Sequence, residues 1–150
     1  MKNITIERLL HPPRGSFFLF GPRCVGKSFW LKQNFGNAPY FDLLENRTYL
    51  ELSRDPTLLE AKIGDKPKGT RVCIDEVQKI PALLSEVHRL IENKGYLFAL
   101  SGSSARKLMR RGADLLAGRA ITARMEGFSY AEMGKFFDLK WVLNWGSLPV

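Results

Sequence analysis

The chain has 150 residues, of which 45% are hydrophobic and 25% charged, and its formal net charge is +8. These values are ordinary for one globular domain with its own core and exclude a wholly disordered chain. No apolar run approaches the roughly 18 residues of a membrane-spanning helix, and the first residues lack the apolar core of a secretory signal, so we expect no membrane partner.

Strands and helices are predicted to alternate along the chain. Residues 3–10 predict a short amphipathic helix that ends at two prolines, and the apolar run 16–20 predicts a buried strand. A helix is expected over 27–34, because this stretch has no Gly or Pro and stops at Gly36. Further strands are predicted over 39–43, 71–76, 96–100 and 120–125, and further helices over 46–52, 56–62, 81–94, 105–111 and 130–135. This alternation predicts a parallel sheet covered by helices on both faces.

The segment between the first strand and the first helix matches the phosphate-binding pattern G-x-x-x-x-G-K-[ST]. In this setting the loop would offer backbone N–H groups, aligned with the helix dipole, to an anion. Lys27 is expected to reach the β- and γ-phosphates of a nucleotide, and the Ser28 hydroxyl to ligate Mg²⁺. The candidate binding residues are Gly21, Pro22, Arg23, Cys24, Val25, Gly26, Lys27 and Ser28. The sequence therefore predicts that the chain binds a nucleoside triphosphate.

Polar residues also end two later strands, at Asp75–Glu76 and at Ser101. Ligands of parallel sheets bind beyond the carboxyl ends of the strands, so these residues are expected to meet the loop at one edge. Asp75 is expected to hold Mg²⁺ through its water shell. Glu76 would take a proton from, or orient, a water aimed at the γ-phosphorus. The second carboxylate favours hydrolysis, because a phosphotransfer kinase has to exclude that water.

Ser101 and Arg119 are further catalytic candidates. The Ser101 hydroxyl could hydrogen-bond the attacking water or the γ-phosphate, and the alternative is an ordinary Ser-Gly-Ser turn. The Arg119 guanidinium could stabilise charge in the transition state, either in its own subunit or in a neighbouring one.

The positive charge is concentrated between residues 106 and 124, which hold six basic residues and one acid. Such a stretch could attract nucleic acid, and the alternatives are a solvated face or an interface with an acidic protein. No recognition-helix pattern or interleaving of aromatic and basic residues supports nucleic acid. Cys24 and Cys73 fall inside the predicted nucleotide-site elements and indicate reduced thiols of a cytoplasmic protein rather than a disulfide.

The chain resembles prokaryotic AAA-type ATPases that pair an N-terminal P-loop domain with a C-terminal domain of unknown function. The resemblance lies in four runs taken in order, residues 18–28, 74–81, 100–108 and 115–120. The resemblance implies a Walker A motif at Gly21–Ser28, a Walker B motif at Asp75 and Glu76, and a sensor hydroxyl at Ser101. It also implies an α/β P-loop NTPase fold, a three-layer sandwich with a five-stranded, mainly parallel sheet. The sensor strand is then expected between the Walker A and Walker B strands.

Two departures from this family bear on function. Cys24 stands where members often have Gly or a polar residue, so binding should survive unless the φ angle there must be positive. In relatives a stretch similar to residues 145–150 leads into the second domain. We therefore expect a single ATPase domain over residues 1–150, with about 137–150 as a linker or the start of a C-terminal domain. Turnover and homo-oligomer assembly would depend on that domain.

Three functions follow from these patterns. The leading one is an ATP-binding domain that hydrolyses ATP with Mg²⁺, at least in full-length form. The second is a nucleotide-dependent switch or interaction module without productive turnover. The third is a basic nucleic-acid-binding protein for which ATP is secondary.

Overall fold

The computed structural model describes residues 5–109 and 116–149. Its strands are β1 (Ser16–Phe20), β2 (Tyr40–Asp42), β3 (Arg71–Asp75), β4 (Leu97–Gly102) and β5 (Ala120–Arg124). Its helices are α1 (Lys27–Asn34), α2 (Asn46–Arg54), α3 (Leu58–Ile63), α4 (Leu83–Lys94), α5 (Ala105–Met109), α6 (Tyr130–Met133) and α7 (Leu139–Trp145), with short 3₁₀ turns η1 (Val77–Lys79) and η3 (Gly134–Phe136). None of the helices described is long and apolar enough to span a bilayer.

The five strands form one sheet in the order β2-β3-β4-β1-β5, and every neighbouring pair is parallel. The expected α/β architecture is therefore confirmed. The expected strand order is confirmed as well, because β4 lies between β1 and β3. The register pairs Phe20 with both Gly102 and Arg124, and Asp42 with Asp75, so the carboxyl ends of the strands share one edge.

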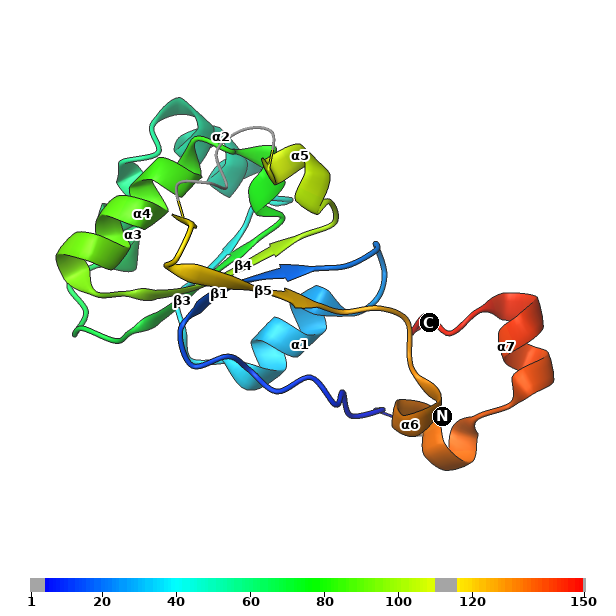
Figure 1. Cartoon of the computed structure of the whole chain (residues 1–150). Coiled ribbons are helices and arrows are strands. Elements are labelled where there is room, and N and C mark those ends of the chain that lie inside the picture. Colours follow the sequence, from blue (N-terminus) through cyan, green and yellow to red (C-terminus); the bar gives the residue numbers. More distant parts are fainter. Residues whose placement is uncertain (1–4, 110–115, 150) are drawn as a thin grey trace.

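Helices cover both faces of the sheet (Figure 1). Side chains of a strand alternate between faces, so Phe17 and Leu19 of β1 meet α1, where they pack with Trp30 and Leu31. The Phe17 and Trp30 rings meet edge to face, with their centroids 6.2 Å apart. This smaller core holds α1 against β1, and so holds the loop that joins them.

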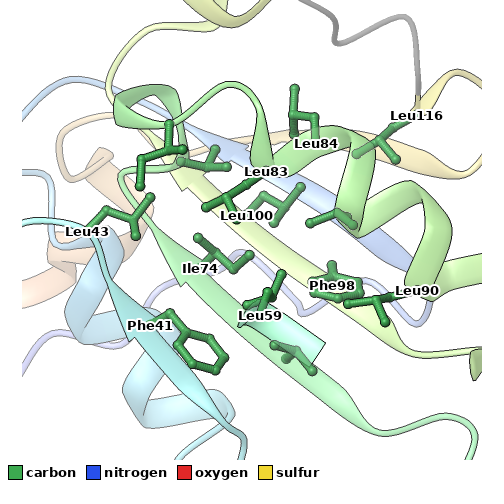
Figure 2. Packing of buried hydrophobic residues seen from close by; sticks show 14 of the residues in the cluster. Phe41, Leu43, Leu59, Ile74, Leu83, Leu84, Leu90, Phe98, Leu100 and Leu116 are labelled. Carbon is green, nitrogen blue, oxygen red and sulfur yellow. The ribbon is translucent and has the colours of Figure 1, made fainter. Parts of the chain in front are cut away.

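A larger core fills the other face, beneath α2, α3 and α4 (Figure 1). Figure 2 shows leucines of α3 and α4, among them Leu59 and Leu83, over Ile74 of β3 and Leu100 of β4. These strands are buried on both faces, which explains their nearly continuous apolar sequence. The central strands are thus held rigidly up to the polar residues at their ends.

One local expectation needs revision. Residues 5–10 are not helical, so the predicted helix over 3–10 is wrong where the structure describes it. Arg8 instead makes contacts with distant parts of the chain, described below.

Residues 139–145 form α7, within the stretch of about 137–150 that was expected to be a linker or the start of a C-terminal domain. The Asp138 carboxylate caps this helix by accepting a hydrogen bond from the Trp141 N–H at 2.9 Å.

Candidate functional site

The loop over residues 21–28, the carboxylates after β3 and Ser101 of β4 lie together at the carboxyl edge of the sheet. The electrostatics agree with this placement. Burial lowers the pKa of the Lys27 ammonium below its ordinary value, and the Glu76 and Asp75 carboxylates act on it in the opposite direction, which places both near it. The structure thus brings together four predicted site residues, Lys27, Asp75, Glu76 and Ser101.

The backbone of the loop departs from regular structure at its glycines. A Cβ at Gly21 would lie 1.9 Å from the Met125 carbonyl oxygen, so no side chain fits where the segment after β5 crosses the loop. Gly26, with a φ of 91°, begins α1 from the left-handed region. The first turn of a helix leaves backbone N–H groups without partners inside that helix. The loop therefore presents a helix N-terminus with the geometry of an anion-binding site.

Lys27 is only 5% exposed, and its ammonium is held by main-chain oxygens. It donates hydrogen bonds to the Gly21 carbonyl at 2.8 Å and to the Pro22 carbonyl at 2.7 Å. An ammonium has three N–H donors, so one remains for an external oxygen. The side chain thus spans the loop with its positive charge at the centre of the site.

Cys24 has a φ of 64°, in the left-handed region where a Cβ is strained. The angle at this position is thus positive, the case in which the sequence left binding in doubt, but the cysteine adopts it nonetheless, at a cost in backbone strain. A non-glycine residue in this region costs roughly 1–2 kcal/mol, whereas glycine adds about 0.4–1 kcal/mol of unfolded-state entropy.

We predict that Cys24→Gly raises the free energy of unfolding by about 0–1.6 kcal/mol, the strain relieved less the added entropy. Urea denaturation followed by circular dichroism measures the change. Cys24→Ala is the matched control, since it removes the thiol and keeps the Cβ. Equal stabilisation by alanine would show that φ is not the cause.

Asp75 is 1% exposed, and hydroxyl groups bind both of its carboxylate oxygens. Ser101 donates a hydrogen bond to Oδ1, and Tyr40 donates to Oδ2 at 2.5 Å. Burial and the neighbouring Asp75 raise the pKa of the Tyr40 hydroxyl, which keeps it a neutral donor. A buried carboxylate needs such partners to remain charged. The one proton of the Ser101 hydroxyl is thus directed to Asp75.

Glu76 has a φ of 59°, again in the left-handed region, directly after β3. Its backbone N–H donates to Ser101 Oγ at 3.1 Å, and its carboxylate accepts a hydrogen bond from the Gln78 side-chain amide. The same amide donates to Ser103 Oγ at 3.2 Å, which ties the residues after β3 to the end of β4. Strained backbone of this kind concentrates at functional sites.

The donors at this edge fit magnesium. No group of three or more His, Cys, Asp or Glu side chains lies together in the part of the chain that is described. Mg²⁺ keeps several waters and binds through one or two carboxylates together with substrate phosphates, so it does not need an all-protein cage. The Asp75 carboxylate and the Ser28 hydroxyl both act on the pKa of the Tyr40 hydroxyl and thus both lie near it. They form a donor set of this sparse kind.

Arg119 lies at the opposite edge of the sheet. It precedes β5, whose first residue, Ala120, pairs with Ser16 at the start of β1. Arg119 is therefore level with Gly15, six residues of extended chain before Gly21, which amounts to about 20 Å. Its guanidinium binds Glu92 of α4 at 2.5 Å. The structure does not bring Arg119 to the phosphate loop of its own subunit.

The structure describes only part of the basic stretch between residues 106 and 124. Arg110 and Arg111 fall outside the residues that the structure describes. Arg119 is paired with Glu92, and Arg124 is exposed on the edge strand β5.

Three residues that sequence reasoning did not single out contact the site. Tyr40 and Gln78 hold the two carboxylates, as described above. Arg8 donates to the Val25 carbonyl of the loop at 2.5 Å, pairs with Glu132 of α6 at 3.3 Å and lies 4.0 Å from the Phe128 ring centroid. Figure 1 shows the N-terminal segment running towards α6. A lone tyrosine or arginine gives no signal in the sequence, but Gln78 is adjacent to the acidic pair and could have been considered.

Known proteins resemble this chain in sequence pattern and in fold. A family described as "AAA domain" matches residues 14–134. A RuvB mutant from Thermotoga maritima has a similar structure, with a TM-score of 0.57 and 13% identity over 87% of this chain and 44% of that one. The ORC2 protein of Aeropyrum pernix, in ADPNP–ADP complexes, gives a TM-score of 0.54 and 15% identity over 87% and 46%. At these identities the likeness concerns the fold, and the chain spans less than half the length of either protein. No curated protein sequence matches the chain.

Proposed function

The chain belongs to the AAA domain family, with the α/β fold of P-loop NTPases, and from this premise we propose that it binds ATP and hydrolyses it with Mg²⁺. One observation carries the proposal. A nearly buried ammonium, Lys27, stands at one sheet edge in the field of two carboxylates, Asp75 and Glu76. Phosphoryl transfer requires positioning and charge neutralisation more than covalent help, and this arrangement supplies both.

Each residue then has a distinct task in binding. The backbone N–H groups of Gly21–Ser28 would receive the phosphate chain, and Lys27 would place its free N–H on the terminal phosphates. Ser28 and Asp75 would hold Mg²⁺, which when bound neutralises charge on the phosphate oxygens. Ser101 would keep the Asp75 carboxylate oriented through its hydrogen bond to Oδ1. The Lys27 ammonium, the cation held by Ser28 and Asp75, and the aligned backbone N–H dipoles would together favour a polyanion.

Glu76 would act on the attacking water. Its carboxylate would orient the water, or take a proton from it, as its oxygen attacks the γ-phosphorus and the bond to the leaving phosphate breaks. The Gln78 amide, which donates to the Glu76 carboxylate, would limit its rotation. Arg119 could reach the phosphate charge only in a second copy of the chain, because it lies at the far edge of its own sheet.

The two cysteines provide a direct test of nucleotide binding. Cys24 is exposed on the phosphate loop, whereas Cys73 is buried and its thiol pKa is raised to about 12 by burial. A thiolate-directed alkylating reagent should therefore modify Cys24 selectively in the folded protein. We predict that saturating Mg²⁺-ATP slows alkylation of Cys24 at least about tenfold, as followed by intact-mass spectrometry; at ten times Kd, free sites fall about tenfold.

Two controls accompany this measurement. Cys24→Ala should take up no reagent in the native state, which verifies the assignment of the modified thiol. Lys27→Ala should be alkylated at the same rate with and without nucleotide. Protection that is absent in the wild-type chain at millimolar Mg²⁺-ATP would refute nucleotide binding at this loop.

A further inference from the structure

Tyr40 is positioned at the site by the pairing of β2 with β3. It lies opposite Cys73 in the register and packs in the core on the α1 face of the sheet. From there its hydroxyl reaches two residues along β3 and donates to Asp75 Oδ2 at 2.5 Å. A phenylalanine would fill the same apolar space, so the hydroxyl has a task beyond packing.

The hydroxyl lies beside both residues of the proposed cation site. Besides donating to Asp75, it lies near enough to the Ser28 side chain of α1 for that side chain to lower its pKa slightly, against the larger effects of burial and Asp75. Ser101 donates a hydrogen bond to the other oxygen of Asp75, so hydrogen bonds to both oxygens fix the orientation of the carboxylate. Each carboxylate oxygen accepts about two hydrogen bonds, and one position on each therefore remains for the water shell of a cation.

We propose that Tyr40 is a positioning residue that pre-orients Asp75 and Ser28 for the magnesium ion of the bound nucleotide. The inference rests on the proposed function and extends it to a residue on a third element of the fold. Partners that orient the ligands of a metal ion usually change its affinity by about 10- to 100-fold when they are removed. The tyrosine hydroxyl touches neither the phosphates nor the water, so its loss should act through the cation.

The test is Tyr40→Phe, which removes the hydroxyl and retains the ring. The Kd for ADP is measured by isothermal titration calorimetry, first with EDTA and then across a series of free Mg²⁺ concentrations. The Kd with EDTA should match that of the wild type, which also shows that the variant is folded. The free Mg²⁺ concentration that gives half of the magnesium-dependent gain in affinity should rise about tenfold or more.

Tyr96→Phe is the matched control. Its hydroxyl is also buried and hydrogen-bonded, to the backbone of Gly64 and Lys66, but it lies at the amino edge of the sheet. It should leave the magnesium dependence unchanged. A Tyr40→Phe variant with the magnesium dependence of the wild type, or with tighter magnesium binding, would overturn the inference and leave the proposed function standing. A wild-type chain whose ADP affinity does not respond to Mg²⁺ would overturn the cation site itself.

Discussion

Replacing Lys27 by alanine is expected to weaken Mg²⁺-ATP binding by about 100-fold. The Lys27 ammonium is almost buried and is anchored by the Gly21 and Pro22 carbonyls, so its remaining N–H is aimed rather than mobile. A hydrogen bond to a charged group contributes about 1.5–3 kcal/mol, or roughly 10- to 150-fold in affinity. Calorimetric titration with a non-hydrolysable ATP analogue measures the loss.

Two companion variants separate binding from folding. Lys27→Met keeps the apolar stem that packs in the loop and should show the same loss of affinity as alanine. Lys66→Ala makes the same change in net charge in the turn before β3, at the far edge of the sheet, and should bind normally. Wild-type affinity in a folded Lys27→Ala protein would disprove a phosphate contact at this residue.

Glu76→Gln is expected to leave Mg²⁺-ATP affinity within about threefold of the wild type and to lower phosphate release by about 100- to 10,000-fold. The range is the usual contribution of a positioned general base. Glutamine has the same shape and cannot accept the proton. Binding should persist because Asp75, and not Glu76, is the carboxylate proposed to hold the cation.

Glu126→Gln is a suitable control for this variant, since it removes an exposed carboxylate just beyond β5 at the same edge of the sheet. Phosphate is measured in a coupled assay at saturating Mg²⁺-ATP. If Glu76→Gln releases phosphate as fast as the wild type, Glu76 is not the base. If the wild-type chain itself releases no more phosphate than Lys27→Ala, the chain is a nucleotide-binding module without turnover.

Two differences between expectation and structure, at residues 5–10 and at α7, have separate causes. Residues 5–10 have the spacing of an amphipathic helix, but Arg8 is bound to Val25 and to Glu132, which lies 124 residues away. Those contacts with the loop and with α6 outweigh a weak local preference. Helix α7 was missed although Asp138 and Gly146 are ordinary start and stop signals.

The position of Arg119 follows from the direction of the parallel strands. The rule that gathers Asp75, Glu76 and Ser101 beyond the carboxyl ends of parallel strands also places a residue that precedes a strand at the opposite edge. Arg119 comes directly before β5, so its separation from the loop of its own subunit could have been predicted. Its ion pair with Glu92 could not, because that contact depends on how α4 packs beside β5.

The pattern of residues along the chain is enough to predict the proposed phosphate loop, the acidic pair and the edge of the sheet at which they meet. These features depend on the spacing of residues within short segments and on the direction of parallel strands, both of which can be read locally. Which groups hold the two carboxylates depends on the tertiary fold. Tyr40 reaches Asp75 because β2 pairs with β3 in one particular register, and the Gln78 amide is shared between Glu76 and Ser103 because β3 and β4 end side by side. Such contacts join residues that are distant in the chain or on different elements, and their geometry depends on packing that no local pattern records.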